Sequence, residues 1–432
     1  MKRLAPLAAV LALLSAVPAA AAPGAPGTPD RGFGRGGTVT IADPSLEFVP
    51  ELVCFRRGRI LVGARAFVPG GGPSPGFSFF RLLPDGSVDR RFGTGGRADA
   101  GLAGARVGAL LPDGGMAAAR STWRRDVRGT LKVVRLMRSG APDPRFGQNG
   151  AATVHVDGIR TVLALAPQPG GAIVVATLLY GGPPPYGFER AVTLIRLDRR
   201  GRVDPSFGAD GRTRVESDVF LNQADVAVRA DGGLVVAVPQ PGPESGAGLL
   251  LASLDADGRP DPSFGADGVV EDPLGPAFPA AIALGRRGQL GVVGTSPVGG
   301  GDFAVWQFAA DGRRTVFEEV ESGAPAENGQ AIAFDQAGRT LLAGHTGRFL
   351  ERTGFAVARI DRSGGADPGF GHSGHFRLGS RAPAEARAIA VQPNGRVLVA
   401  GSQRRGSWVS GIFRRSKPGV IRLLRLWGGP VS

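Results

Sequence analysis

Arginine and glutamine side chains recur at one position of a repeated apolar segment, and these groups could bind an anion. Aligning the segments on their apolar ends brings together Arg106, Gln330, Arg387 and Glu51, with Arg160 and Gln223 within one residue of that position. Guanidinium and amide groups donate hydrogen bonds to carboxylate, sulfate and sugar oxygens. We therefore expect a polar collar that takes an anionic or glycan ligand, and a solvated polar rim without a ligand is the alternative.

Aromatic residues lie in the segments whose length varies most between repeats. Trp123, Tyr186 and Trp408 each occur in a stretch rich in Gly, Pro or Arg between two apolar runs. Variable loops on a rigid scaffold commonly carry function, and aromatic residues beside arginine are frequent in recognition surfaces. We expect these three residues to contact a ligand, and packing within their own loops is the alternative.

Residues that could hold a metal or act as nucleophiles are sparse. Asp204 and Asp210 resemble two carboxylates of a calcium loop, but Asp followed by Pro begins a turn, and calcium requires more oxygen ligands. His372 and His375 are the closest histidine pair, and Cys54 is the single cysteine, so a zinc site lacks further ligands. No G-x-S-x-G elbow, phosphate loop or dinucleotide motif follows a predicted strand. The sequence therefore predicts no catalytic residue, metal or cofactor.

A repeated turn motif, D-x-x-F-G-x-x-G, sets the elements that position these side chains. Its six copies are Asp30–Gly37, Asp89–Gly96, Asp143–Gly150, Asp204–Gly211, Asp261–Gly268 and Asp367–Gly374. Successive motif phenylalanines lie 59, 54, 61 and 57 residues apart, and the last gap of 106 residues spans two periods. Phe317 lies halfway along that gap, so we expect a seventh, degenerate register there.

Each repeat predicts four short β-strands. Turns such as Asp113-Gly114 and Asn394-Gly395, between alternating apolar runs, predict a hairpin. A third β-branched run follows, and the motif then leads into a short fourth strand. Four strands without helical periodicity are typical of one β-propeller blade.

The two ends of the chain complement each other. Residues 29–41 supply a fourth strand with no blade before it, and Val420–Leu426 align with the third strands with no fourth strand after them. Pairing these two segments removes open sheet edges. The sequence therefore predicts an all-β fold, a single β-propeller over residues 29–432. We expect seven four-stranded blades, closed by an N-terminal outer strand that completes the last blade.

The same motifs resemble a known repeat family. The D-P-S-F-G-A-D-G copies at Asp204–Gly211 and Asp261–Gly268, with the pattern A-x-x-x-x-x-G-x-x-L-V-A-G, look like the delta-60 repeats of bacterial β-propellers. The likeness covers nearly all of residues 29–427. It implies the fold, and it implies no reaction, cofactor or catalytic residue.

The N-terminus and the charge bear on location and partners. Lys2 and Arg3 precede an apolar core and a run of small residues, which is typical of a secretory signal peptide. We expect a signal peptide over residues 1–21, a flexible lead-in over residues 22–28, and a secreted or periplasmic mature protein without a membrane span. The formal net charge is +14, which favours acidic partners, but export and the lack of interleaved aromatic and basic residues argue against nucleic acid.

These observations predict an exported binding or interaction scaffold that acts through its variable-loop face. We expect a monomer whose partner is a glycan, another anion or a protein. A hydrolase or lyase that uses the mouth of the central channel is one alternative. A passive structural or adhesive module is the other.

Overall fold

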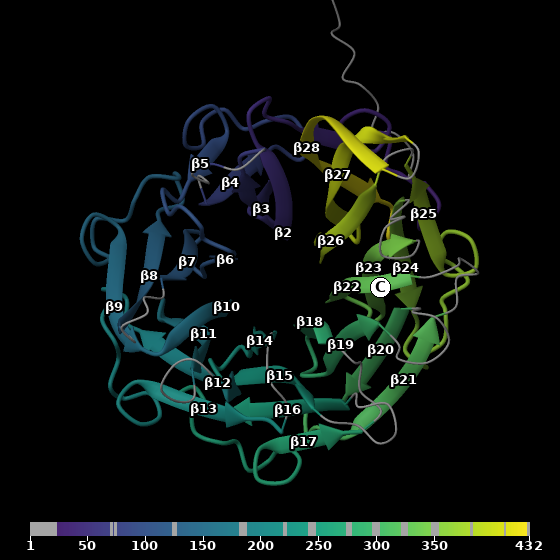
Figure 1. The fold of residues 1–432 in the computed structure, drawn as a ribbon. Helices are drawn as coiled ribbons and strands as arrows, with labels where there is room; N and C mark the ends of the chain where they lie inside the picture. The colour runs from purple at the N-terminus through teal and green to yellow at the C-terminus, as the bar shows by residue number, and fades with distance from the viewer. Residues whose placement is uncertain are drawn as a thin grey trace, which may run out of the picture.

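A computed structural model describes residues 24–69, 72, 76–122, 128–180, 188–218, 223–240, 248–273, 279–295, 303–320, 327–346, 354–380, 383–409 and 412–429. Over these residues the protein is all β: twenty-eight strands form seven four-stranded antiparallel sheets. The sheets stand as blades in a ring around a central opening (Figure 1). The described residues include no helix with the length and apolarity that a membrane crossing requires. The predicted seven-bladed propeller is confirmed.

The blades follow one another along the chain, and the first strand of each lies nearest the opening (Figure 1). Blade 1 consists of β2 (Glu47–Arg56), β3 (Arg59–Phe67), β4 (Gly76–Leu82) and β5 (Arg97–Asp99). Blade 2 consists of β6 (Val107–Leu110), β7 (Met116–Thr122), β8 (Arg128–Leu136) and β9 (Ala151–Asp157). Blade 3 consists of β10 (Ile159–Pro167), β11 (Ile173–Tyr180), β12 (Phe188–Leu197) and β13 (Arg212–Glu216). Blade 4 consists of β14 (Asp225–Val228), β15 (Leu234–Gln240), β16 (Gly248–Leu254) and β17 (Val269–Asp272). Blade 5 consists of β18 (Pro279–Leu284), β19 (Leu290–Thr295), β20 (Phe303–Phe308) and β21 (Arg314–Val320). Blade 6 consists of β22 (Glu327–Phe334), β23 (Thr340–Thr346), β24 (Gly354–Ile360) and β25 (His375–Gly379), and blade 7 of β26 (Ala384–Val391), β27 (Val397–Val409), β28 (Ile412–Leu426) and β1 (Thr38–Ile41).

The ring closes through blade 7, which is built from both ends of the chain. Strand β1 is antiparallel to β28, with Thr38 opposite Leu424 and Ile41 opposite Ile421. In Figure 1 the purple N-terminal strands of blade 1 stand next to the yellow C-terminal strands of blade 7. The predicted closure by an N-terminal outer strand is therefore confirmed.

The phenylalanine of each turn motif is a buried contact between neighbouring blades. The motif phenylalanines are at most 1% exposed; they are Phe33, Phe92, Phe146, Phe207, Phe264 and Phe370. Phe33 packs against Gly86 of blade 1, where a Cβ would lie 2.8 Å from the ring and where φ is +91°, so this position requires glycine. The glycine after the phenylalanine donates its N–H to the next blade, as Gly208 does to the carbonyl of Asp257 at 2.7 Å. The motif thus joins blades as well as turning the chain.

An arginine of the third strand, which the sequence patterns did not reveal, binds the motif aspartate. Arg196 Nε lies 3.0 Å from the Asp204 carboxylate, and its guanidinium lies 4.9 Å from the Phe207 ring centre. Arg196 also donates to the carbonyl of Ala256 in the next blade at 2.6 Å. The equivalent pairs are Arg81 with Asp89, Arg135 with Asp143, Arg359 with Asp367 and Arg425 with Asp30. Each such arginine ties its own turn motif to the following blade.

Blade 5 carries the degenerate register expected at Phe317. Gln307 stands where blades 1, 2, 3, 6 and 7 place the arginine, since it pairs with Gly291 as Arg196 pairs with Val174. Blade 4 has Ser253 at this position, and there Arg229 binds the motif aspartate, Asp261, at 2.9 Å. Phe317 is 38% exposed and contacts the buried Trp306 ring, with centroids 5.1 Å apart. In the described residues, blade 5 therefore has no buried Arg–Asp–Phe arrangement.

The segment before β1 completes blade 7. The chain ends divide this blade at the turn between its third and fourth strands. Gly371 donates its N–H to the carbonyl of Pro26 at 2.9 Å, and Gly27 donates to the carbonyl of Trp427 at 2.6 Å. The Pro26 carbonyl thus accepts the hydrogen bond from the motif glycine of blade 6. At the other junctions a turn residue of the next blade accepts this bond.

Candidate functional site

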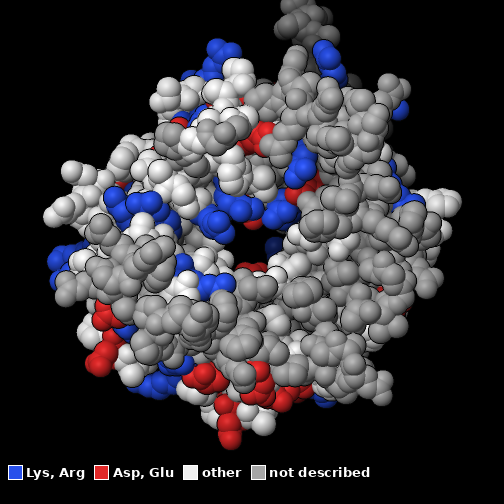
Figure 2. All heavy atoms as spheres, in the orientation of Figure 1, with Lys and Arg blue, Asp and Glu red and all other residues white. Residues whose placement is uncertain are grey.

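A cavity opens at the mouth of the central channel on the variable-loop face, which bears the loops between second and third strands. Its volume is about 720 Å³, a size typical of ligand sites. Figure 2 shows Lys and Arg side chains gathered around the central opening on this face. Five of the six predicted collar residues line the cavity: Glu51, Arg106, Arg160, Gln223 and Arg387. The structure therefore brings most of the predicted collar to one place.

A β-bulge sets the position of three of the predicted collar residues. The pairing of first with second strands skips one residue in blades 1, 6 and 7, and the skipped residues are Glu51, Gln330 and Arg387. A bulged residue falls out of the ladder and bends its strand, which re-aims its side chain. Arg106 occupies the corresponding place immediately before β6. The predicted alignment of these four positions agrees with the strand pairing.

Two collar residues deviate from that alignment, one of them more than predicted. Gln223 precedes β14, and the matching position is its neighbour Ala224. In β10 the bulge that matches Glu51 falls at Leu163, and Arg160 lies three residues before it. The prediction that Arg160 lies within one residue of the collar position is therefore wrong. The reason is a second bulge at Arg160 itself, which extends β10 beyond the first strands of the other blades. Arg160 still lines the cavity because this extra length carries it to the mouth.

Positive charge dominates the cavity. Five arginines line it against one carboxylate, that of Glu51: they are Arg65, Arg106, Arg120, Arg160 and Arg387. Glu51 is held by Arg65, whose Nε lies 2.6 Å from its Oε1, and more loosely by Arg387 Nη2 at 3.8 Å. This single acid therefore neutralises only part of the arginine charge, and the cavity attracts anions.

The guanidinium groups of the mouth differ in how far the protein already occupies their hydrogen-bond donors. Arg106 is exposed, and among the described residues its side chain has no hydrogen bond or ion pair. Arg387 Nη1 contacts the Glu385 carboxylate at 3.1 Å, but its Nε is buried without a hydrogen-bond partner in the described chain, as is Nε of Arg120. Arginine presents its donors in a planar fork that matches carboxylate and sulfate groups. An anion at the mouth would therefore meet the exposed Arg106 guanidinium first.

The remaining predicted site residues are not gathered at this cavity. Gln330 is half-buried in β22 and is not among the residues that line it. Trp123 and Tyr186 lie outside the described residues. The backbone of Trp408 pairs with Phe413 across β27 and β28, and its side chain lies outside the described part of the chain.

The cavity also contains arginines that the sequence did not suggest. Arg65 and Arg120 come from the ends of the second strands β3 and β7, next to the loops of the variable face. Their only sequence signal is a charged residue within a strand of small and apolar residues, such as the alanine run of β7. The alignment of collar positions compares first strands, whereas both arginines come from second strands.

The residues that could serve metal or acid–base chemistry have structural roles. Asp210 has φ +52° at the left-handed turn position of its motif, which Asp and Asn tolerate. His372 and His375 pair through their backbones at the turn of blade 6. The described residues contain no group of three or more His, Cys, Asp or Glu placed to hold a metal. Burial raises the pKa of Cys54 to about 11, so the thiol stays neutral.

Asp225 is a further carboxyl group of the first strands, at the start of β14. Burial raises its pKa above the ordinary value, and hydrogen bonds from the amides of Ile282 and Val226 act in the opposite direction. Its Oδ2 accepts the Ile282 amide at 3.0 Å and its Oδ1 accepts the Val226 amide at 2.9 Å. Because Ile282 belongs to blade 5, this carboxyl group links blades 4 and 5.

Comparison with known proteins agrees with the fold and leaves function open. A family model described as "Domain of unknown function (DUF5122) beta-propeller" matches residues 58–92, from the first hairpin turn of blade 1 to its motif phenylalanine. This match supports a bacterial β-propeller repeat family. No curated protein matches the chain significantly.

Among solved structures, the chain is similar to several at low sequence identity. The WD40 domain of Toxoplasma gondii coronin is 11% identical, with a TM-score of 0.47, and the alignment covers 94% of this chain and 89% of that one. The β-propeller domain of the Trilobed protease from Pyrococcus furiosus is 8% identical, with a TM-score of 0.45 and coverage of 85% and 97%. An N11 neuraminidase-like protein of A/flat-faced bat/Peru/033/2010 is 8% identical, with a TM-score of 0.43 and coverage of 95% and 99%. None of these similarities indicates a function for this chain.

Proposed function

We propose that this protein is an exported binding scaffold whose channel mouth takes an anionic ligand, most simply a sulfated or uronate-bearing glycan of the cell envelope or its surroundings. The single observation that carries the proposal is the cavity of about 720 Å³ lined by five arginines and one carboxylate. The signal-like N-terminus supports export, and the motifs quoted above support a delta-60 repeat protein. We propose that it acts as a monomer.

The size and charge of the mouth favour a glycan over an isolated small anion. The cavity spans side chains from blades 1, 2, 3, 4 and 7, from Glu51 through Gln223 to Arg387. A ligand that contacts blades this far apart must present several oxygens, and an oligosaccharide with repeated acidic groups does so. The glutamine and threonine side chains of the wall, Gln223 and Thr161, suit sugar hydroxyl groups.

Calorimetry with defined oligosaccharides tests the proposal. The probes are a heparin octasaccharide, a galacturonate octamer and a neutral dextran oligomer of similar length. We expect binding of one or both acidic probes and no binding of dextran. Affinity should fall as salt is raised, because ions screen the exposed arginines.

Paired substitutions identify the site. The variant Arg106→Ala/Arg387→Ala should weaken the acidic probe at least about tenfold, since loss of two charge-assisted hydrogen bonds exceeds about 1.4 kcal/mol. The control variant Arg286→Ala/Arg287→Ala removes the same charge from the exposed turn between β18 and β19 and should bind as the wild type does. Unchanged affinity in the first variant, or an equal loss in both, would remove the proposal. Cleavage of a probe would show that the mouth is an enzyme site.

A further inference from the structure

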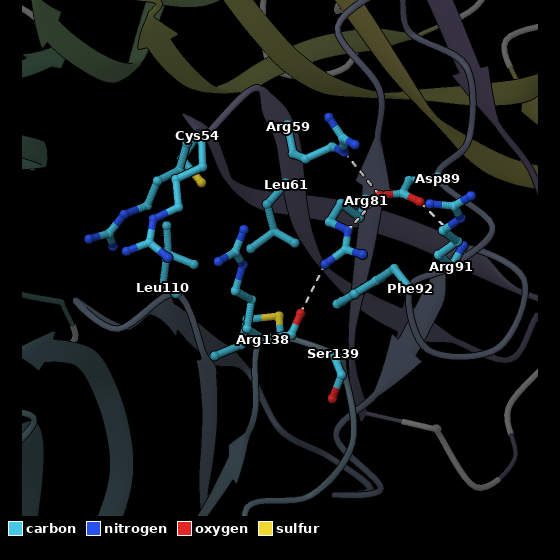
Figure 3. Close-up of a pocket in the computed structure, with 14 residues that line it drawn as sticks. Cys54, Arg59, Leu61, Arg81, Asp89, Arg91, Phe92, Leu110, Arg138 and Ser139 are labelled. Carbon is cyan, nitrogen blue, oxygen red and sulfur yellow. Dashed lines mark hydrogen bonds and ion pairs between the residues drawn. The ribbon is translucent and has the colours of Figure 1, made fainter.

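A second cavity lies between blades 1 and 2 on the turn face, which bears the turns between first and second strands. Its volume is about 460 Å³, within the usual range for small-molecule sites. Apolar side chains from both blades form part of its wall: Leu61, Phe92, Leu110 and Met116. In Figure 3 the Arg138 side chain extends from the turn of blade 2 toward Leu61 and Leu110. The cavity therefore combines an apolar wall with a cationic rim.

The charge of this cavity is strongly unbalanced. Six arginines line it with a single carboxylate, Asp89; they are Arg56, Arg57, Arg59, Arg81, Arg91 and Arg138. Asp89 Oδ2 accepts Arg59 Nε at 3.1 Å and Arg81 Nε at 2.9 Å (Figure 3). Burial opposes ionisation of Asp89, but the Arg91 amide and the Arg81 guanidinium hold its pKa below the ordinary value. The one acid of the cavity is thus already shared by two arginines.

The other arginines face the cavity without a neutralising partner. Arg56 donates to the carbonyls of Leu111 and Pro112, which fixes it in the wall and leaves its charge uncompensated. The side chains of Arg57, Arg91 and Arg138 are exposed and form no hydrogen bond or ion pair among the described residues. A concave site lined by one sign of charge concentrates ligands of the opposite sign.

The backbone of Arg57 adopts a left-handed conformation that arginine rarely takes. Arg57 has φ +49° and is followed by Gly58 at φ +73°, in the two-residue hairpin turn between β2 and β3. Such a turn prefers Asn-Gly or Asp-Gly. The other non-glycine residues with positive φ in the described chain are Asn149, Asp210, Asp267 and Ser373, all short and polar. A large side chain in a strained conformation is a reason to look for function at that site.

We propose that the cavity between blades 1 and 2 binds a small amphipathic organic anion, with a carboxylate, phosphate or sulfonate group on a hydrocarbon or aromatic body. The anionic group lies against Arg57 and Arg138 at the rim, where guanidinium groups supply paired donors. The apolar body packs on Leu61 and Leu110. This site is separate from the channel mouth and does not depend on the glycan proposal.

Fluorescence titration with 8-anilinonaphthalene-1-sulfonate tests the site, because this probe is an aromatic sulfonate. N-phenyl-1-naphthylamine, the same ring system without the sulfonate, reports the apolar contribution alone. We expect the wild type to bind the sulfonate at least tenfold more tightly than the neutral amine. The variant Arg57→Asn/Arg138→Ala should lose at least tenfold in affinity for the sulfonate and none for the amine. Asparagine suits the turn, so this variant should keep the thermal midpoint of the wild type.

One further variant completes the test. Arg286→Ala/Arg287→Ala removes equal charge from the exposed turn of blade 5 and should bind the sulfonate as the wild type does. The proposal is overturned if this control weakens the sulfonate as much as the Arg57/Arg138 variant does. It is also overturned if that variant binds normally, or if the neutral amine binds as tightly as the sulfonate.

Discussion

Replacing Asp30 with asparagine should lower the free energy of unfolding by about 3 kcal/mol, because it breaks a buried ion pair that closes the ring. Asp30 is 2% exposed and Arg425 is 6% exposed. Asp30 Oδ2 lies 2.8 Å from Arg425 Nε and 2.8 Å from Arg425 Nη2, and Arg396 Nε contacts the same oxygen at 2.8 Å. The two ends of the chain thus meet at one carboxylate.

The expected loss follows from what the substitution leaves behind. Removing one partner of a buried pair costs about 3–5 kcal/mol because the other charge stays buried. Arg425 would keep its contact with the Phe33 ring, 4.5 Å from the centroid, and its hydrogen bond to the carbonyl of Pro84. Asparagine can still accept the hydrogen bond that the Gly32 amide gives to Asp30 Oδ1. These retained contacts place the loss at the lower end of the range.

Urea unfolding followed by tryptophan fluorescence measures the effect. The matched control is Glu216→Gln, the same chemical change in the exposed pair with Arg214, whose side chains are 68% and 49% exposed. Exposed pairs contribute about 0–1 kcal/mol, so the control should stay close to the wild type. A loss below about 1 kcal/mol for Asp30→Asn, with an unchanged m-value, would refute the view that this pair closes the ring.

Three further predictions follow from the same contacts. Starting the chain at residue 42 removes β1 and leaves β28 as an open edge, so the truncated protein should form oligomers in light-scattering chromatography, whereas a chain starting at residue 24 should not. Burial opposes ionisation of Asp89 and Asp204, but their hydrogen bonds and arginine partners hold the folded pKa below the ordinary value. The stability that these two ionised carboxylates contribute is therefore complete above about pH 5 and is lost as the pH falls through their lowered folded pKa. At pH values below about 4 the urea midpoint of the wild type should decrease, and that of Asp204→Asn should decrease less steeply. Amide hydrogens of β21 should exchange faster than those of β13, because the described residues of blade 5 include no arginine-held turn motif; equal protection would contradict this.

The repeated motif accounts for how much of the fold could be predicted. Phe33 and its five counterparts marked the period, and the spare strand near Thr38 showed where the ring closes. Both signals are local in the sequence. The partner of the motif aspartate was missed because Arg196 and Asp204 lie on opposite sides of a turn, eight positions apart, and no simple strand or helix period links them.

The collar could be predicted only in part, for a related reason. Arg106 and Arg387 follow from strand alignment, since every first strand starts at the same end of the channel. Arg160 was placed wrongly because a bulge changes the count of residues without changing the apolar pattern. Arg65 reaches the cavity from a second strand, so its role depends on how neighbouring strands pack.

A co-crystal structure with the tightest-binding acidic oligosaccharide tests the central claim most directly. The anion-binding account predicts a sulfate or carboxylate group within hydrogen-bonding distance of Arg106 and Arg387, with the chain of sugars crossing the channel mouth. Sugar bound on the outer rim of the blades, with the mouth filled by solvent alone, would contradict it.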